Sequence, residues 1–400
     1  MAYITKSLSE VTDMASGGTP NRKIAEYWNG DIPWVTTAEV AQNRIITNTK
    51  ERITEIGLKN SSAKIFPANS ILLALYGQGK TRGKVALLGI EASTNQACLA
   101  IIPNQDELEV GFLYYYLENS YEKMRSMANT GGQDNLSMAI VKEMPITYPS
   151  LDKQKKISKL FTTIDSKIQL QKEKIDLLNK RMKGYMEKIF NQELRFKDKD
   201  GQTYNNWKEY KLKDIGSTFT GLSGKSKEDF GFGNHLFITY TNVFNNLFAS
   251  KNGIEKVNVL ETENQALVQK GDILLTTSSE TPHEVGMASI WNHSMENVHL
   301  NSFCFGYRLN QSEKILPEFV AISLRSDYMR KKIILLAQGS TRFNMSKTEL
   351  MLQTIKIPFV GEQHKIVNFY KTLEQQLNLA MQQLELLKTQ KQAFMQQMLI

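Results

Sequence analysis

Two long heptad patterns constrain the fold of this chain more than any other feature of its sequence. In the first, from about residue 151 to residue 190, two positions of each heptad form an apolar stripe in which only Gln171 is polar. The second, from about residue 360 to the end, repeats this register with an offset of 209, and only Lys391 interrupts it. One helix cannot bury such a stripe alone, so we expect the two helices to pack on each other as an antiparallel coiled coil.

These helices end two similar halves of the chain. Forty helical residues reach about 60 Å, so the paired helices would form a spacer; the alternative is that each helix packs on its own domain. Matched residues recur in one order, and their offset drifts from 202 to 209, as short insertions in surface loops would produce. The matches are Leu8 with Leu212, Glu10 with Asp214, Gly17 with Gly221, Ile71–Leu73 with Ile273–Leu275, Asn95 with Asn301, Cys98 with Cys304, Tyr121 with Tyr328, Asn135 with Asn344 and Pro149 with Pro358.

The globular parts combine short β-rich runs, such as Ile71 to Tyr76, with a helical pattern from Val110 to Met127. We therefore predict an α+β fold with two tandem small domains of mixed sheet and helix, each followed by a long helix, with internal pseudo-twofold symmetry. The predicted boundaries are 1–149 and 193–358 for the domains and 150–192 and 359–400 for the helices. A polar, turn-rich linker is predicted from Asn191 to Tyr210, with Trp207 packing on the edge of the second domain.

The formal net charge of +8 suits a polyanionic partner, because Lys and Arg that neutralise phosphates release counterions from a nucleic acid. A merely basic surface is the alternative. Cys98 and Cys304, the only cysteines, lie in apolar strand-like runs, which suits buried thiols in a reducing compartment. No apolar run is long enough to cross a bilayer, and residues 1–8 contain no apolar signal segment, so we expect a cytoplasmic protein.

A phosphate-binding loop is the nearest approach to a catalytic motif. Gly79-Lys80-Thr81 follows an apolar strand, but Ala74 stands where that motif has its first glycine, and a strand pattern resumes after Arg82 where a helix should begin. We therefore expect a hairpin here. Gly224-Lys225-Ser226 also lacks the upstream glycine. A P-loop nucleotide hydrolase is the competing hypothesis, and it requires ATP binding that Lys80→Ala abolishes.

Other catalytic signals are missing from the sequence. It has no acidic-or-amide, proline, proline, aromatic tetrapeptide of the kind that holds a flipped base in amino-methyltransferases. Asp106-Glu107 suits a helix start better than a nuclease metal site, because no lysine follows closely. We therefore predict no catalytic site, no metal and no cofactor. Neither zinc-ligand spacing nor a local acid–base partner is found at the histidines, which are His235, His283, His293, His299 and His364.

What remains is recognition chemistry in loops between matched strands. In the first half these loops hold amides and cations suited to bidentate contacts with base edges, although a solvated loop has a similar composition. In the second half the flanking strands repeat but the loop from Thr277 to Glu284 is chemically different. Residues 17–23 and 221–227 offer backbone donors and cations suited to phosphates, with ordinary turns as the alternative. Two copies of one scaffold would thus read two different sequences.

The candidate DNA-binding residues come from these loops and from matched positions near them. In the first half they are Thr19, Asn21, Arg22, Lys23, Gln78, Lys80, Thr81, Arg82, Lys84, Asn95, Gln96 and Asn135. In the second half they are Ser223, Lys225, Lys227, Ser278, Ser279, Thr281, His283, Asn301, Arg342 and Asn344.

The order domain, long helix, domain, long helix resembles the specificity (S) subunits of type I restriction-modification systems over essentially the whole chain. Gly18-Thr19-Pro20 through Trp34 looks like that family's first-domain opening, and Leu194-Arg195-Phe196 through Glu209 looks like the opening of its second domain. Pro149 to Gln154 looks like its helix start. The first half lacks a segment like Arg195 to Glu209, and the second half lacks a threonine-proline like Thr19-Pro20.

The resemblance implies that each globular region is a target recognition domain, which reads one half of a bipartite double-stranded DNA target from the major groove while the helices fix the gap. It also implies two docked methyltransferase (M) subunits, which would flip an adenine in each half-site, and endonuclease/translocase (R) subunits that join for restriction. These partners would supply cofactor, ATP and chemistry. A coiled-coil scaffold is a third hypothesis, and it predicts no salt-dependent duplex binding.

Overall fold

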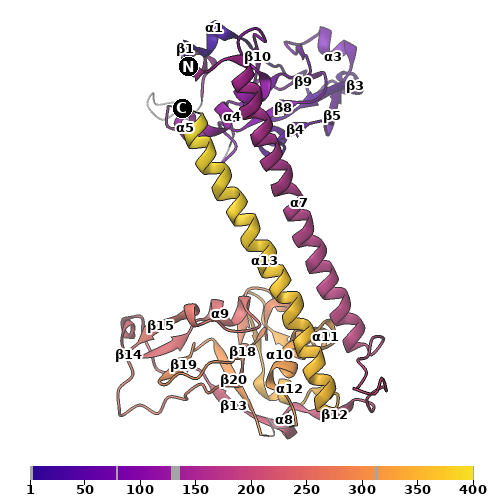
Figure 1. The fold of residues 1–400 in the computed structure, drawn as a ribbon, viewed down its shortest axis with the longest axis vertical. Coiled ribbons are helices and arrows are strands. Elements are labelled where there is room, and N and C mark those ends of the chain that lie inside the picture. Colours follow the sequence, from indigo (N-terminus) through magenta and orange to yellow (C-terminus); the bar gives the residue numbers. More distant parts are fainter. Residues whose placement is uncertain (1–2, 78–79, 128–135, 311–313, 400) are drawn as a thin grey trace. The chain divides into compact units, whose positions relative to one another are not determined.

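The computed structural model describes residues 3–77, 80–127, 136–310 and 314–399 (Figure 1). Their contacts divide the chain into two compact units, residues 1–173 with 381–400 and residues 174–380. Each unit therefore holds one globular domain, part of the long helix that follows it and part of the other long helix. In the described part of the chain, no helix is both long and apolar enough to span a membrane.

The first half of the chain runs through short strands and helices into a forty-residue helix. Its elements are β1 (Ile4–Ser7), α1 (Leu8–Val11), β2 (Thr12–Ser16), η1 (Ala25–Tyr27), β3 (Trp28–Val35), α2 (Thr37–Gln42), β4 (Ile45–Ile46), β5 (Glu51–Ile53), α3 (Glu55–Lys59), β6 (Ile65–Phe66), β7 (Ile71–Ala74), β8 (Val85–Leu88), β9 (Ala92–Thr94), β10 (Cys98–Pro103), α4 (Val110–Asn119), α5 (Tyr121–Met127), α6 (Met138–Lys142), β11 (Pro145–Tyr148) and α7 (Leu151–Phe190).

The second half repeats most of this succession, but its described residues have no counterparts of β4, α3 and β6, and it adds η3, β17, η4, β21 and β22. Its elements are β12 (Lys208–Lys211), α8 (Leu212–Ile215), β13 (Gly216–Thr220), η2 (Lys227–Asp229), β14 (Phe230–Ile238), α9 (Tyr240–Asn245), η3 (Lys251–Gly253), β15 (Ile254–Val257), β16 (Asp272–Thr276), β17 (Ser278–Ser279), η4 (Pro282–Glu284), β18 (Ala288–Trp291), β19 (Val298–Leu300), β20 (Cys304–Leu309), α10 (Pro317–Arg325), α11 (Asp327–Ile334), β21 (Ala337–Gln338), β22 (Phe343–Met345), α12 (Lys347–Met351), β23 (Thr354–Ile357) and α13 (Val360–Met398).

Four strands in the same order build the central sheet of each half, and β4 adds a fifth strand to the first sheet. Among the described residues, the first central sheet has the order β2-β10-β7-β8-β4 and the second has the order β13-β20-β16-β18. In each half the first strand also pairs antiparallel with the strand that leads into the long helix, β1 with β11 and β12 with β23. These matched topologies confirm the predicted duplication and the α+β class.

Strand β7 shows why the central strands are continuously apolar. All four of its residues are buried. Side chains alternate between the two faces of a strand, and accordingly Ile71 and Leu73 join the core cluster under helix α4, whereas Leu72 and Ala74 join a second cluster on the other face. The second half repeats this arrangement at β16, where Ile273 and Leu275 lie in one cluster and Leu274 in another.

A buried glutamine at the same place in both halves ties each long helix to its domain. The Gln154 side chain is fully buried, donates to the Glu107 and Pro149 carbonyls, both at 2.9 Å, and accepts from the Glu109 NH at 2.8 Å. The matched Gln363 donates to the carbonyls of residues 314 and 358 and accepts from the NH of residue 316. All polar atoms of both amides are therefore used to hold backbone groups that no regular ladder satisfies.

The two long helices pack on each other within each unit, as the heptads predict. In the first unit the polar exception Gln171 donates to Gln383 on α13 at 3.2 Å, and Ile164 is buried beside the end of that helix. In the second unit Tyr185 of α7 meets Phe369 of α13 edge to face, with ring centroids 5.2 Å apart. Residue numbers rise along one helix as they fall along the other, so the pairing is antiparallel and the predicted coiled coil is confirmed.

The predicted linker is shorter than its polar composition suggests. Lys208 to Tyr210 form part of β12, which pairs with β23, so the extended turn-rich segment ends at Trp207. Trp207 is buried against Phe190 and Phe319, as predicted for the edge of the second domain. The polar residues Lys208 and Glu209 look like linker residues in sequence because they face solvent on an edge strand.

Candidate nucleic-acid interface

The loop that resembles a phosphate-binding motif is a hairpin. Strands β7 and β8 are antiparallel neighbours, and the Gly83 NH donates to the Ala74 carbonyl at 2.9 Å. Gly83 has a φ of 84°, which a residue with a side chain rarely adopts. A strand therefore follows the glycine-lysine-threonine segment where a phosphate site requires a helix N-terminus. Of the residues predicted to read DNA, Gln78 and Asn135 lie outside the described residues.

Tyr121, on α5, contacts the hairpin backbone and two cations, Lys84 of the hairpin and Arg125 of its own helix. Its hydroxyl donates to the Lys80 carbonyl at 2.8 Å and accepts from Arg125 Nη1 at 2.8 Å. The Lys84 ammonium lies 4.2 Å from the centroid of the Tyr121 ring, within cation–π range. Thr81 and Arg82 are partly exposed on the same loop, and Lys80 is exposed. The three cations of the loop were predicted from the sequence, whereas Arg125 was not, because only its contact with Tyr121 brings it to the loop.

The exposed aromatic residue beside this loop was also missed. Tyr76 follows β7 and is 40% exposed. Its neighbour Leu75 is buried and donates its NH to the Ala97 carbonyl at 2.8 Å, which fixes the backbone at this point. An apolar run that ends in tyrosine gives no sign, in sequence, that its last ring points outward.

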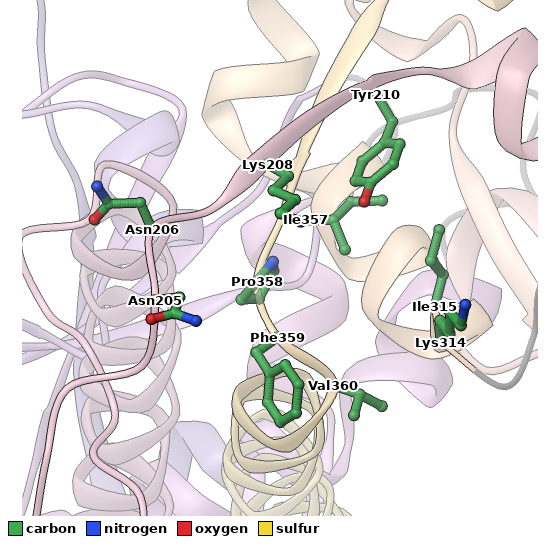
Figure 2. A pocket seen from close by; sticks show the side chains of 10 residues that line it. All are labelled: Asn205, Asn206, Lys208, Tyr210, Lys314, Ile315, Ile357, Pro358, Phe359 and Val360. Carbon is green, nitrogen blue, oxygen red and sulfur yellow. The ribbon is translucent and has the colours of Figure 1, made fainter.

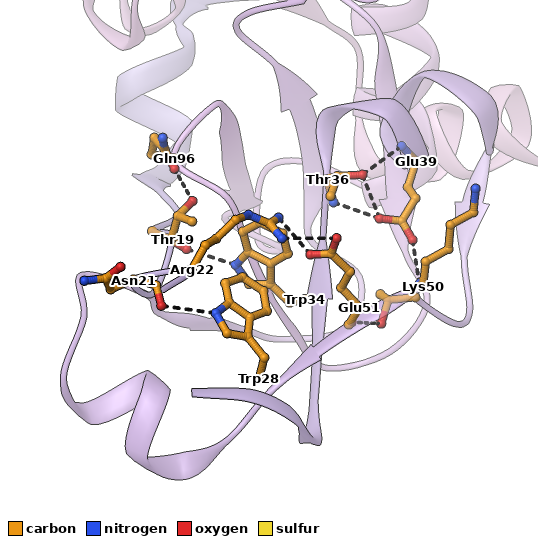
Figure 3. A network of polar contacts seen from close by, with 12 residues as sticks. Thr19, Asn21, Arg22, Trp28, Trp34, Thr36, Glu39, Lys50, Glu51 and Gln96 are labelled. Atoms are coloured by element: carbon orange, nitrogen blue, oxygen red, sulfur yellow. Dashed lines mark hydrogen bonds and ion pairs between the residues drawn. The ribbon is translucent and has the colours of Figure 1, made fainter. Parts of the chain in front are cut away.

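Residues of the first glycine loop bind one another (Figure 3). The Thr19 hydroxyl donates to the Gln96 amide oxygen, so the two predicted loops meet. The Asn21 side chain accepts from the Lys23 NH at 3.0 Å and stabilises a turn. Asn95 also shapes a turn, because its carbonyl accepts from the Cys98 NH at 3.1 Å. Of these residues, Asn21, Lys23 and Gln96 are exposed.

Arg22 is held by two tryptophans and a carboxylate (Figure 3). Its guanidinium carbon lies 4.5 Å from the Trp28 ring and 5.1 Å from the Trp34 ring. Its Nη2 also lies 2.8 Å from Glu51 Oε2. The sequence pattern predicts that Arg22 binds phosphate. In the structure its guanidinium forms an ion pair with Glu51, and the side chain is still 56% exposed.

The matched loop of the second half is built differently. Ser278 and Ser279, both predicted to read DNA, are buried in strand β17, which pairs with β22. The Ser279 hydroxyl donates to Glu284 at 2.8 Å. Thr281 and His283 are exposed on the following turn. Of these four predicted residues, therefore, Thr281 and His283 reach solvent, whereas Ser278 and Ser279 do not.

Phe303 and Arg342 form the exposed aromatic and cationic feature of the second half. Phe303 is 49% exposed in the turn before β20, and the Arg342 guanidinium carbon lies 4.8 Å from its ring centroid. The Phe303 carbonyl accepts from the Thr277 NH at 2.8 Å, so this turn adjoins the recognition loop. Exposed Asn344 lies opposite Ser278 in the β22–β17 pair. Arg342 and Asn344 were predicted, whereas Phe303 was missed.

The second glycine loop neutralises its buried lysine. Lys225, with a side chain only 4% exposed, lies 2.6 Å from Glu263, and the pKa of that carboxyl is lowered by this hydrogen bond. The Ser223 NH donates to Gln265 at 3.1 Å. Lys227 is exposed. Asn301 accepts from the Phe303 NH at 2.9 Å and, like its match Asn95, shapes a turn.

A cavity of about 440 Å³ lies away from these loops, where α13 begins (Figure 2). None of the ten residues that line it belongs to the predicted reading set. Phe359 is 60% exposed at its rim and stacks on Tyr204. The described residues also contain no group of three His, Cys, Asp or Glu side chains that could hold a metal ion.

Both cysteines are buried in matched strands, β10 and β20. Burial raises the pKa of the Cys98 and Cys304 thiols well above the usual range. The two side chains are therefore inert packing residues, as expected from the apolar runs around them.

The family model described as type I restriction modification DNA specificity domain matches residues 3–180 and 204–389. The chain is 29% identical over 235 residues to the type I restriction enzyme MjaIX specificity subunit of Methanocaldococcus jannaschii, an alignment that covers 56% of this chain and 54% of that subunit. It is 22% identical over 389 residues to the MjaVIII specificity subunit of the same organism, covering 95% of this chain and 88% of the relative. The chain thus spans about half the length of the first of these relatives.

The fold is shared with a solved S subunit. The crystal structure of the type I restriction-modification system S subunit from M. genitalium superposes with a TM-score of 0.57 at 16% identity, covering 100% of this chain and 96% of that one. The likeness supports the fold, and the two family matches cover both halves of the chain. This chain therefore belongs to the family of type I restriction modification DNA specificity domains.

Proposed function

We propose that this chain is the sequence-recognition subunit of a type I restriction-modification complex, in which each globular domain reads one half of a bipartite DNA target. The domains are residues 1–149 and 193–358, and the long helices set the gap between the half-sites. One observation carries the proposal: matched strands such as β7 and β16 have the same neighbours, but the loops that follow them differ in charge, aromatic content and burial.

The first domain presents a cationic reading loop. Lys80 is exposed, and Lys84 and Arg125 lie around Tyr121 beside it. Such cations suit phosphates and guanine edges. The exposed ring of Tyr76 adds an apolar surface that suits a thymine methyl group. We propose that these side chains, with Thr81 and Arg82, make the first half-site contacts.

The second domain presents a less cationic surface. Phe303 carries the exposed ring, Arg342 is the cation stacked on it, and Asn344, Thr281 and His283 supply polar edges. An asparagine suits the adenine edge and an arginine the guanine edge. The two domains therefore differ in the bases that they are equipped to contact, which is what a bipartite, asymmetric target requires.

Matched leucines on the two long helices support docking of two methyltransferase subunits. Leu170 and Leu177 on α7 and Leu379 and Leu386 on α13 are 65%, 66%, 58% and 58% exposed. The offset between the two pairs is 209, the offset of the repeated heptads. Water-exposed leucines at equivalent places on both repeats suit two copies of one partner. Endonuclease/translocase subunits would join this assembly, and the partners would supply cofactor, ATP and catalysis in the cytoplasm, where the thiols stay reduced.

The docking proposal is tested by charge placed on the leucines. Leu170→Asp combined with Leu379→Asp should abolish co-purification of the chain with its methyltransferase subunit while leaving the circular dichroism of the chain unchanged. Gln376→Asp, at another exposed position of α13, is the matched control and should bind normally. Normal binding by the leucine variant would place the methyltransferase contact elsewhere.

The recognition function is tested by expressing the chain with a partner methyltransferase subunit and mapping adenine methylation across a genome by single-molecule sequencing. We expect a split motif with a fixed gap. A stable complex that methylates no such motif, and that shows no salt-dependent duplex binding, would instead support the coiled-coil scaffold hypothesis.

A further inference from the structure

Lys391, the charged interruption of the second heptad stripe, is placed in an ionic cluster of the first unit. Its side chain is 16% exposed, and its ammonium lies 2.8 Å from Glu118 Oε2 and 2.9 Å from Asp165 Oδ1. Arg44 Nε lies 3.2 Å from Asp165 Oδ2. The Tyr115 hydroxyl donates to Asp165 at 2.8 Å and accepts from Arg44 at 2.7 Å. Two cations thus balance two carboxylates.

The cluster joins four separate parts of the first unit. Glu118 lies in the last turn of α4, Asp165 on α7, and Arg44 just before β4, all in the first half of the chain. Lys391 lies on α13 and is the cluster's contribution from the second half. The Asp165 and Lys391 side chains are 14% and 16% exposed, so water screens their charges poorly. Removing any one of the four charges would leave one uncompensated charge in the cluster.

The corresponding place in the second unit has a different charge pattern. The heptad offset of 209 makes Met182 of α7 the match of Lys391 and Glu374 the match of Asp165. The offset of 207 between Tyr121 and Tyr328 matches Arg325 of α10 to Glu118 of α4. Met182 packs against the apolar core of the second unit. Arg325 donates to the Val243 and Phe244 carbonyls at 3.0 and 2.9 Å, and burial lowers its pKa to about 10. By this match, a cation at residue 182 would face Arg325 and Glu374, which interact electrostatically, and would add an unbalanced positive charge to them.

We propose that these four charges make the pairing of the long helices heterotypic, so that the first domain accepts the end of α13 and rejects a second α7. A second α7 would bring Met182 to Glu118 and Asp165 and leave an excess negative charge. A second α13 would bring Lys391 to Arg325 and create an excess positive charge. The rest of the stripe has one register in both helices, so this position distinguishes between partners that otherwise fit alike.

The inference is independent of DNA recognition, and its test uses the full-length chain without DNA or partner subunits. Cysteines at Gln171 and Gln383, whose side-chain amides lie 3.2 Å apart, report the correct pairing as an intramolecular crosslink made by a short bifunctional maleimide. Cys98 and Cys304 are buried and do not compete. Pairing with a second chain would instead give crosslinked dimers, so electrophoresis distinguishes the two outcomes.

The first comparison is a double-mutant cycle on the cluster. Lys391→Met and Glu118→Gln each unbalance the cluster, so each should lower the Tm by several degrees and reduce the yield of the intramolecular crosslink. Together they leave Arg44 with Asp165, a balanced pair, so the double variant should be more stable than Lys391→Met alone. Loss of packing would not produce this recovery. Lys388→Met removes an exposed ion pair with Glu385 and is the matched control, expected to leave Tm and crosslinking unchanged.

The second comparison exchanges the two seam residues. Lys391→Met with Met182→Lys keeps composition and net charge but puts each residue in the wrong unit. We expect this exchange variant to be less stable than either single variant and to form crosslinked dimers or no crosslink. Additive losses in the first cycle, or an exchange variant that crosslinks within one chain as well as the parent does, would overturn the proposal.

Discussion

The two domains differ least where side chains hold backbone groups and most where side chains face solvent beside β7 and β16. Gln154 and Gln363 bind carbonyls and an NH at matched positions. The loops after these strands share no such constraint: one carries Lys80 on a hairpin, and the other buries Ser278 in a strand. A scaffold residue is thus identified by the backbone groups that its side chain binds, and a candidate reading residue by the exposure of its side chain to solvent.

The two halves are expected to differ most in stability at the start of their long helices, where α13 has a buried ion pair. Arg195 donates to fully buried Glu362 at 2.7 and 2.8 Å. The residue of α7 that matches Glu362 is Lys153, whose amine donates to the hydroxyl of exposed Tyr3. Arg195→Ala should destabilise the second unit by about 3–5 kcal/mol, because it leaves a buried carboxylate unpaired. Tyr3→Phe should cost about 0–1 kcal/mol.

Urea denaturation, followed by hydrogen exchange of α13 amides, measures the Arg195→Ala effect in the second unit. Adding Glu362→Gln should recover part of the loss, because the neutral amide no longer needs a cation. If Arg195→Ala and Tyr3→Phe cost the same, the helix starts would be energetically equivalent despite their different contacts.

The two buried glutamines should contribute equally to the free energy of unfolding of their units. Gln154→Leu and Gln363→Leu each remove two donors and an acceptor from buried backbone groups, so each should cost about 2–4 kcal/mol. The two costs should agree within about 1 kcal/mol if the duplicated glutamines do the same work. Denaturant midpoints of the two variants, with exposed Gln376→Leu as the control, measure this. A large difference would show that the repeats have diverged in their cores as well as in their loops.

The long helices and the duplication were predictable because both depend on periodicity. The heptad register of residues 157–189 recurs in 366–398 whatever the tertiary context, and the structure pairs the helices accordingly. Strand β7 was also predictable from the sequence, because a strand buried on both faces is apolar at every position. The break of the predicted Val110–Met127 helix at Ser120 was not, because the sequence stays compatible with a helix on both sides of it.

The reading surface was only partly predictable because it depends on contacts between distant segments. Arg125 reaches the hairpin through Tyr121, which binds the Lys80 carbonyl 41 residues earlier. Ser278 and Ser279 are polar, but pairing with β22 buries them, and no local pattern announces a two-residue strand. Phe303 reads as a core residue by type and lies instead on the surface. The loops could be identified from their composition, whereas the structure was needed to show which of their side chains are exposed to solvent and so able to contact DNA.

The loop difference itself is tested with matched variants in the complex with the methyltransferase subunit. Lys80→Ala should weaken methylation at one half-site alone, and Arg342→Ala at the other alone, because the residues lie in different units. Loss of one base contact is worth about 1–3 kcal/mol, or about ten- to a hundredfold in discrimination. Motif mapping by single-molecule sequencing measures both. Lys388→Met, on α13, should leave both half-sites intact, and a variant that relaxes both halves would contradict separate reading.

The smallest expected difference is in acid sensitivity, since all five histidines lie in the second half. His299 is buried, its Nδ1 lies 2.9 Å from the Ala266 carbonyl, and its Nε2 lies 2.9 Å from His235 Nδ1. Burial lowers the pKa of His299. The neutral ring can donate to Ala266 and accept from His235, whereas the protonated ring has no acceptor left for His235.

Because the pKa of His299 is lowered in the folded state, the stability of the second unit should fall as the pH falls. Above about pH 6.5, the unfolded pKa of histidine, His299 is neutral in both states and the second unit keeps its full stability. As the pH falls toward the lower folded pKa, the unfolded chain binds the proton more readily and stability is lost. The first unit has Ser93 at the matched position and should not respond. Thermal unfolding from pH 7.5 to 5 should therefore show the second unit weakening first, and His299→Asn should reduce that dependence whereas exposed His283→Asn should not.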